Sequence, residues 1–269
     1  MKKQYLFFFS LMVLFLSLAG CSNSDLPKNT GEDKREGAGE KVELTISAAA
    51  SLQDALTEIE TRFEKEHPNV LINFNFGASG SLQQQISQGA PADLFFSAAE
   101  DKFDKLVNDG LIEENNGIDL VGNELVLVVP KKSALKIKSF SDLTNADKLS
   151  IGTPESVPAG KYAKELLEKM DIWNNIEEKV VPAKDVRQVL TYVETNNVDA
   201  GIVYKTDALI SEKVDMVDTA DENTLNPIIY PLGVIKDTSH PEEANLFYDY
   251  LQNEISMGIF EEYGFKGLK

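Results

Sequence analysis

The sequence of 269 residues contains a single cysteine, Cys21, so no disulfide can form within the chain. It contains only two histidines, His67 and His240, and each stands directly before a proline in a predicted surface loop. The sequence therefore shows no His/Cys cluster spaced for a metal ion and no Ser-His-Asp pattern for nucleophilic catalysis. Gly-x-Ser-x-Gly and Gly-Lys-Ser/Thr motifs are also missing. These absences argue against an enzyme, and they indicate no catalytic residue, no metal ligand and no cofactor.

Positive charge is also scarce in this chain. Lys and Arg together number 26 against 44 Asp and Glu, which gives a formal net charge of −18. An acidic protein of this kind is repelled by the phosphates of nucleic acids and by anionic lipid headgroups. We therefore expect no nucleic-acid partner. The sequence contains no internal repeat. We expect the protein to be a monomer.

The one long apolar run covers Leu6 to Leu16, and it is too short for a membrane-spanning helix, which needs about 20 apolar residues. Two lysines precede this run, and small residues lead from it into Cys21. The order resembles a bacterial lipoprotein signal, which implies that residues 1–20 are a signal peptide and that the thiol of Cys21 is lipidated after cleavage. The alternative is an ordinary secretory signal with a chance cysteine near its end. The lipoprotein reading implies a mature chain anchored to the extracytoplasmic face of the cell membrane.

Residues 21–40 are rich in Asn, Ser, Asp, Pro, Lys, Gly and Glu and nearly lack bulky apolar side chains. Such a segment cannot bury enough surface to order itself, so we predict a disordered tether. From Lys41 onward, apolar strand patterns, such as Leu149–Gly152 and Ala200–Tyr204, alternate with helical patterns, such as Val186–Glu194. This alternation predicts an α/β fold of two lobes, each with a mostly parallel sheet flanked by helices and with the ligand cleft between the lobes. We expect lobe 1 to comprise 41–121 plus 232–269 and lobe 2 to comprise 122–231.

Four predicted helix starts present small or hydroxyl residues and no basic ligand. They are Ala50-Ser51, Ala78-Ser79-Gly80-Ser81, Val157-Pro158-Ala159-Gly160 and Lys184-Asp185-Val186. Helix N-termini offer unpaired N–H groups and the positive end of the helix dipole, so several that converge on one cleft would bind an anion through neutral donors. Each start by itself has a simpler interpretation, as an N-cap or a turn. Ser51 with Asp54 and Ser81 with Gln84 match capping boxes, and we interpret Asp185 as an N-cap.

Six segments together resemble the molybdate-binding proteins of ABC importers, in order along nearly the whole chain from Lys41 to Phe265. They are Ala48–Leu52, Gly89–Phe95, Val157–Ala163, Ala183–Arg187, Gly201–Tyr204 and Tyr263–Phe265. The resemblance implies a two-lobed, periplasmic-binding-protein-like fold. It also implies that the oxygens of the anion are bound by Ser51, Ser79, Ala159, Val186 and Tyr204. Glycine stands next to Ser79, and this leaves open whether Ser79 or Ser81 supplies the second hydroxyl.

The same resemblance implies a function: capture of molybdate, and of tungstate, by closure of the lobes and delivery to an ABC permease in the membrane. Molybdate, tungstate and sulfate are fully deprotonated near neutral pH and suit a site made of donors alone. Phosphate keeps a proton, so a phosphate site needs an acceptor. Asp185 is the one acid in the predicted shell. The alternative is a binding protein for another tetrahedral oxyanion such as sulfate or phosphate.

Overall fold

The computed structural model describes residues 41–133 and 136–268. The signal peptide, the tether and the lipidation site at Cys21 lie outside the described residues and stay predictions. The described chain contains helices α2 (Gln53–Glu66), α3 (Ser79–Ser87), α4 (Glu100–Asn108), α5 (Pro158–Lys169), α6 (Trp173–Ile176), α7 (Val186–Glu194), α8 (Lys205–Leu209), α9 (Pro241–Tyr250) and α10 (Glu254–Glu262). Its strands are β1 (Val42–Ala49), β2 (Val70–Gly77), β3 (Leu94–Phe96), β4 (Ile112–Asn123), β5 (Leu125–Pro130), β6 (Leu149–Gly152), β7 (Val180–Ala183), β8 (Ala200–Tyr204), β9 (Val214–Thr219), β10 (Ile228–Ile235) and β11 (Lys266–Gly267). Short 3₁₀ helices cover Ala50–Leu52, Phe140–Asn145 and Glu177–Lys179.

These strands form two sheets. The first has the order β11-β4-β10-β3-β1-β2 and the second has the order β7-β6-β8-β5-β9. The prediction of mostly parallel sheets is wrong, because each sheet is mixed. In the first sheet β1 pairs in parallel with β2 and β3, whereas β10 is antiparallel to β3 and β4. In the second, β6 is parallel to β7 and β8, whereas β5 is antiparallel to β8 and β9.

The antiparallel strands are those by which the chain moves between the sheets. The chain leaves the first sheet at the end of β4, enters the second through Glu124 and β5, and returns after β9 into β10. The sequence predicted a return to the first lobe at residue 232, but the regular strand–helix alternation did not indicate that β10 and β5 pair antiparallel with their neighbours. The lobe limits proposed above stay a prediction about which parts move as units.

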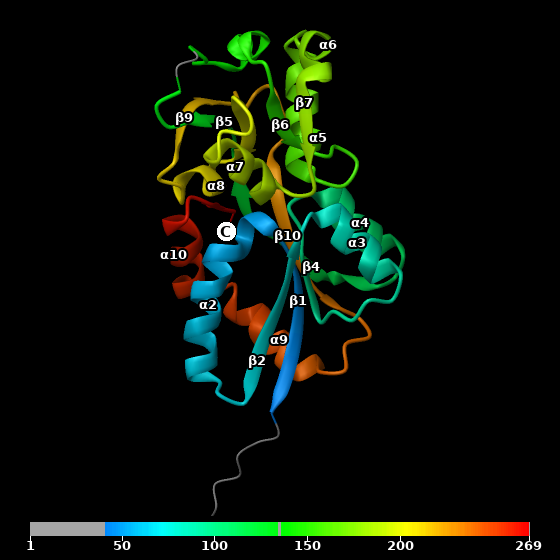
Figure 1. Ribbon diagram of the computed structural model, residues 1–269. Helices are drawn as coiled ribbons and strands as arrows, with labels where there is room; N and C mark the ends of the chain where they lie inside the picture. The colour runs from blue at the N-terminus through cyan, green and yellow to red at the C-terminus, as the bar shows by residue number, and fades with distance from the viewer. Residues whose placement is uncertain (1–40, 134–135, 269) are drawn as a thin grey trace, which may run out of the picture. The chain divides into compact units, whose positions relative to one another are not determined.

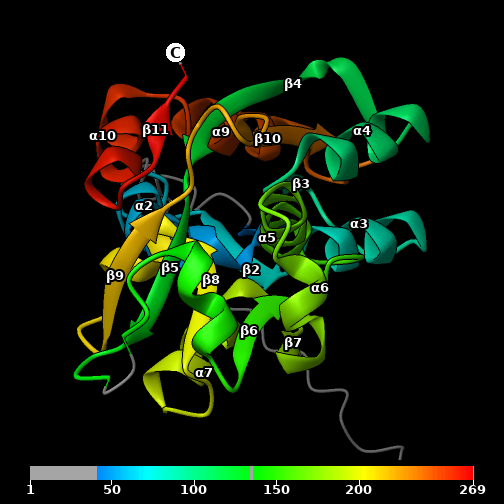
Figure 2. The ribbon, with the colours of Figure 1, turned by 90° about the horizontal axis from the view of Figure 1, so that it is seen from above.

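Helices cover both faces of the first sheet. Figures 1 and 2 show α2, α9 and α10 on one side of it and α3 and α4 on the other. Strand β3 explains the two layers, because Leu94 and Phe96 belong to the large apolar core while Phe95 packs with Phe103 of α4 in a smaller one. Alternate side chains of a strand point to opposite faces, so this three-residue strand contributes to both cores.

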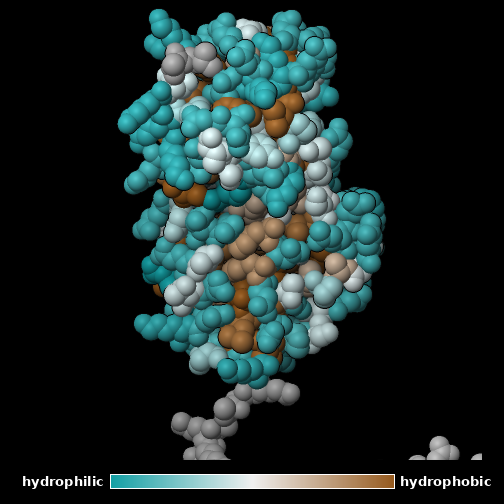
Figure 3. All heavy atoms as spheres, in the orientation of Figure 1, coloured by the Kyte–Doolittle hydropathy of each residue, from teal (hydrophilic) through white to brown (hydrophobic). Residues whose placement is uncertain are grey.

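Strand β5, which lies between β8 and β9 in the second sheet, is buried at all of its residues. Its sequence is an unbroken apolar run, as expected for a strand covered on both faces. No helix in the described part of the chain is both long and apolar enough to span a membrane. The face shown in Figure 3 is mostly hydrophilic, with hydrophobic residues in small groups.

Candidate functional site

All five residues predicted to bind an anion line one small cavity. Its volume is about 10 Å³, room for the centre of about one water molecule. Each of the five is at most 4% exposed. The cavity lies where β1 and β2 of the first sheet and β8 of the second sheet end, beside the starts of α3, α5 and α7. Its predicted ligands are Ser51, Ser79, Ala159, Val186 and Tyr204. Because these residues are buried, no ion can reach the cavity unless the surrounding elements separate.

Ser51 enters the cavity from the end of β1. The predicted capping box of Ser51 with Asp54 is wrong, because Ser51 lies within the 3₁₀ helix Ala50–Leu52 and α2 starts only at Gln53, without a side-chain cap. The Ser51 hydroxyl instead lies 2.9 Å from the hydroxyl of Tyr230. The Ser51 hydroxyl therefore does not cap the start of α2 and can interact with a ligand in the cavity.

Ser79 begins α3 and is 1% exposed. Its hydroxyl oxygen accepts a hydrogen bond of 2.9 Å from the backbone N–H of Ala98. Ser81 is half-buried and does not line the cavity. Its predicted capping box with Gln84 is also wrong, because α3 starts two residues earlier and has no side-chain cap.

Ala159 lies in the first turn of α5, which starts with Pro158 where a missing N–H costs nothing. The next residue must be glycine, because a Cβ on Gly160 would lie 1.9 Å from the carbonyl oxygen of Gly152 at the end of β6. This close approach of helix to strand holds the start of α5 at the cavity.

Val186 is the first residue of α7, and the N-cap before it is Asp185 as predicted. The carboxylate of Asp185 accepts a hydrogen bond of 2.8 Å from the backbone N–H of Gln188. The only acid of the predicted shell is therefore engaged with its own helix, and it is not among the residues that line the cavity.

Tyr204 ends β8, and its hydroxyl donates to the carbonyl oxygen of Ala98 at 3.5 Å. Burial raises the pKa of Tyr204 well above its ordinary value, and the nearby Tyr230 acts in the same direction. The hydroxyl therefore keeps its proton at every physiological pH. It remains a hydrogen-bond donor next to the cavity.

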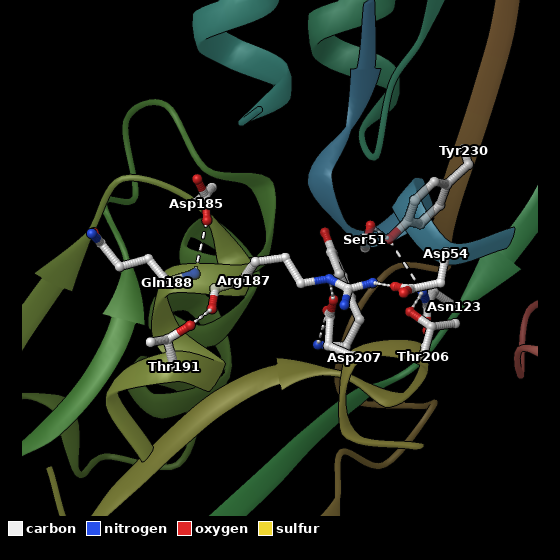
Figure 4. A network of polar contacts seen from close by, with 11 residues as sticks. Ser51, Asp54, Asn123, Asp185, Arg187, Gln188, Thr191, Thr206, Asp207 and Tyr230 are labelled. Atoms are coloured by element: carbon white, nitrogen blue, oxygen red, sulfur yellow. Dashed lines mark hydrogen bonds and ion pairs between the residues drawn. The ribbon is translucent and has the colours of Figure 1, made fainter. Parts of the chain in front are cut away.

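Sequence analysis missed a second layer of polar residues behind Ser51 (Figure 4). The side-chain amide of Asn123 donates to the hydroxyl of Tyr230 at 3.1 Å and to that of Thr206 at 3.0 Å. Tyr230 in turn contacts Ser51. Asn123 and Tyr230 lie at the ends of β4 and β10 that adjoin the second sheet. The available signal was two polar side chains in otherwise apolar strand ends, and that signal is weak.

Arg187, next to Val186, connects the two halves of the site. Its guanidinium is hydrogen-bonded to Asp54 of α2, and its Nε lies 2.8 Å from Oδ1 of Asp207 in α8. The second contact is an attraction between charges without hydrogen-bond geometry, since neither atom has a hydrogen-bond partner. Asp207 is completely buried, and burial raises its pKa to about 7 although Arg187 acts in the opposite direction.

Two larger cavities lie elsewhere and contain none of the five predicted ligands. One, of about 570 Å³, is lined mainly by the segments that join the sheets, 122–125 and 220–229. The other, of about 410 Å³, lies beside α4 and is lined by Glu100, Asp104, Glu114 and Asp119. An acidic lining repels anions. Among the described residues, no group of His, Cys, Asp or Glu is arranged to hold a metal ion.

The chain is similar to known solute-binding proteins. The family model described as bacterial extracellular solute-binding protein matches residues 44–266. YvgL of Bacillus subtilis (strain 168), which carries the name of an ABC transporter substrate-binding lipoprotein, is 56% identical over 98% of this chain and 99% of its own. The molybdate-binding protein ModA of Escherichia coli (strain K12) is 40% identical over 82% of this chain and 88% of its own.

Solved structures show the same fold. One described as the substrate-binding domain of a molybdenum ABC transporter from Clostridium difficile has a TM-score of 0.65 and 43% identity, and the match covers 85% of this chain and 100% of the other. More distant structures share only the architecture. The chain thus has the two-lobed α/β fold of periplasmic binding proteins, as its sequence predicted.

Proposed function

Because the chain belongs to the bacterial extracellular solute-binding protein family, we propose that it captures molybdate outside the cytoplasmic membrane and delivers it to an ABC permease. The observation that carries the proposal is the meeting of Ser51, Ser79, Ala159, Val186 and Tyr204 in one buried cavity. These residues come from five separate segments of the chain. The family resemblance of the sequence implies the same five residues as ligands of the anion.

The chemistry of the cavity favours a fully deprotonated oxyanion. Its lining contains hydroxyls, backbone groups and apolar side chains, and no side chain of Lys, Arg, Asp or Glu. Three helices, α3, α5 and α7, start at the cavity, so their N–H groups and dipoles face it. In a dry site, such fixed neutral donors stabilise a divalent anion without a cation. Molybdate and tungstate have this charge and no proton, and we expect both to bind.

The size of the cavity excludes large ligands. A volume of about 10 Å³ leaves no room for an organic ligand such as an amino acid or a sugar. Burial of all five residues also implies a mechanism, because loading and release both require the two lobes to separate. We propose that the loaded, closed form docks on the permease.

The decisive experiment is isothermal titration of the purified protein with molybdate, tungstate, sulfate and phosphate in separate runs. Tight one-to-one binding of molybdate and tungstate, with sulfate and phosphate silent, is the expected result. Binding of sulfate or phosphate instead would keep the transport role and reject the ligand. Silence toward all four would reject the site.

Attachment to the membrane is a separate part of the proposal and rests on Cys21. The similar protein YvgL carries the name of a lipoprotein. We expect cells that express the chain to incorporate labelled fatty acid into it and to keep it in the membrane fraction, whereas Cys21→Ser releases it unlabelled into the medium. Retention of the Cys21→Ser protein in the membrane fraction would reject the lipid anchor.

A further inference from the structure

The orientation of the Asn123 side chain is fixed by chemistry. Its Oδ1 accepts a hydrogen bond of 2.8 Å from the backbone N–H of Glu124, a group that can only donate. The amide nitrogen must therefore face the other way, toward the hydroxyls of Tyr230 and Thr206. Since an amide N–H₂ group can only donate, both hydroxyl oxygens act as acceptors in these two contacts.

This orientation determines where the proton of Tyr230 points. Tyr230 is fully buried, and burial raises the pKa of its hydroxyl well above the ordinary value, so the proton stays on the oxygen. The oxygen accepts from Asn123, and two other hydroxyls reach it, those of Ser51 and Tyr204. The Ser51 hydroxyl, at 2.9 Å, makes the better contact, so we assign the Tyr230 proton to it. Ser51 then accepts from Tyr230, and its own proton is free to point into the cavity.

Ser79 reaches the same state by a different route. Its oxygen accepts a hydrogen bond from the backbone N–H of Ala98, another group that can only donate. The Ser79 proton is therefore also free to point into the cavity. Both serines can thus present a donor to a ligand.

We propose that Asn123 and Tyr230 are positioning residues that orient the Ser51 hydroxyl as a donor through the chain Asn123→Tyr230→Ser51. The inference deepens the proposed function and rests on it, because the ligand that benefits is an oxyanion without a proton. Neither residue lines the cavity. Their effect on affinity passes entirely through the direction of one hydrogen bond.

Asn123→Asp reverses the direction of these hydrogen bonds with almost no change in the shape of the side chain. A carboxylate still accepts from the N–H of Glu124, but it can also accept from Tyr230, and the tyrosine proton then turns away from Ser51. Ser51 must either donate to Tyr230 or lose that contact. We expect molybdate affinity to fall by roughly 100-fold, of which part is repulsion between the new carboxylate and the anion.

The double variant Asn123→Asp/Tyr230→Phe separates the effect of hydrogen-bond direction from the repulsion between the new carboxylate and the anion. Without the tyrosine hydroxyl nothing draws the Ser51 proton away from the cavity, although the carboxylate remains. We therefore expect the double variant to bind molybdate about tenfold more tightly than Asn123→Asp alone. Equal or weaker binding by the double variant overturns the inference. If the unaltered protein does not bind molybdate, the proposed function is overturned instead.

A second pair of variants, Tyr230→Phe with and without Ser51→Ala, tests the inference even if Asn123→Asp does not fold. Tyr230→Phe alone should weaken molybdate binding by about 3- to 10-fold, because the Ser51 hydroxyl is no longer held in one direction. In a Ser51→Ala background the same change should have no further effect. A full effect in that background would show that Tyr230 acts by packing and would overturn the inference. Tyr250→Phe, which removes a tyrosine hydroxyl bonded at 3.0 Å to Glu66 far from the cavity, is the matched control and should leave affinity unchanged.

Discussion

The backbone N–H of Gly80 donates a hydrogen bond of 3.0 Å to the carbonyl oxygen of Ser156. Gly80 lies in the first turn of α3, against the first sheet, and Ser156 precedes α5, against the second. The contact therefore joins the two halves of the structure directly beside the cavity. A Cβ on residue 80 would lie 2.6 Å from the same oxygen, so no other residue allows this approach.

Gly80→Ala should consequently weaken molybdate binding. The added methyl group keeps α3 and the loop before α5 apart, and overpacking of this kind costs about 1–3 kcal/mol, or roughly 5- to 150-fold in the dissociation constant. Titration calorimetry measures the effect. Gly258→Ala is the matched control, because a Cβ there meets nothing within 4 Å and alanine favours the α10 helix. Equal affinities for the two variants would contradict the prediction.

Three serine-to-alanine variants distinguish the residues that line the cavity from their neighbour. Ser51→Ala and Ser79→Ala should each weaken molybdate binding by about 1–3 kcal/mol, the range for loss of a hydrogen bond to an ion. Ser81→Ala should change it by less than about threefold, since Ser81 is half-buried and outside the cavity. The measurement is the dissociation constant of each variant. A larger loss from Ser81→Ala than from Ser79→Ala would assign the second hydroxyl to Ser81.

The ion pairs between the two halves should differ in their effect on release. Asp54→Asn removes the partner of Arg187 in α2, and because the Arg187 side chain is only 20% exposed we expect molybdate to dissociate about 3- to 10-fold faster. Asp101→Asn removes the partner of Lys161, a pair in which both side chains are almost half exposed, and should change the rate by less than about twofold. Stopped-flow release into a chelating competitor measures both rates. Equal acceleration by the two variants would be evidence against a special role for Arg187.

Asp207 gives the stability a specific pH dependence. Its carboxyl has a pKa of about 7 in the folded chain against 3.8 as the reference value, so the folded state binds the proton more tightly. Its contribution to the free energy of unfolding is therefore highest at acidic pH and decreases as pH rises from about 4 to about 7. Each pKa unit corresponds to about 1.4 kcal/mol, so the total decrease is at most about 4 kcal/mol.

The comparison of the unaltered protein with Asp207→Asn isolates this contribution, because the asparagine does not titrate. Urea unfolding at several pH values should show the stability of the unaltered protein falling relative to that of Asp207→Asn as pH rises over this interval. A difference that stays constant, or one that grows with pH, would disprove the assigned titration of Asp207.

Local patterns predicted the elements that build the site, and in several cases their limits. The strands Leu149–Gly152 and Ala200–Tyr204 and the helix Val186–Glu194 have the bounds expected from the sequence. Each is a short apolar segment between clear turn residues, so neighbouring structure has little influence on where it ends. Two of these segments place predicted ligands at the cavity, Val186 at the start of its helix and Tyr204 at the end of its strand.

The prediction failed where tertiary contacts decide. Strand β4 (Ile112–Asn123) was missed because its first half is polar and exposed, and it is a strand only because β10 pairs with it. The hydroxyl of Ser51 was predicted to cap a helix, which is the commoner local role of such a serine. Its actual partner, Tyr230, is 179 residues away in the sequence, and no local pattern indicates a contact of that range.

The order of the strands along the chain also has a consequence for how the protein is assembled. All strands of the second sheet lie in one continuous stretch, Leu125 to Thr219, so this sheet contains every strand it needs before the chain is complete. The first sheet cannot close at that stage, because β3 and β4 are joined to each other only through β10, which is synthesised after the second sheet. Ser51 and Tyr230 come together at this last step. A chain that stops short of β10 therefore contains every strand of the second sheet and all five predicted ligands, but it lacks the strand that joins β3 to β4 and the Tyr230 hydroxyl behind Ser51.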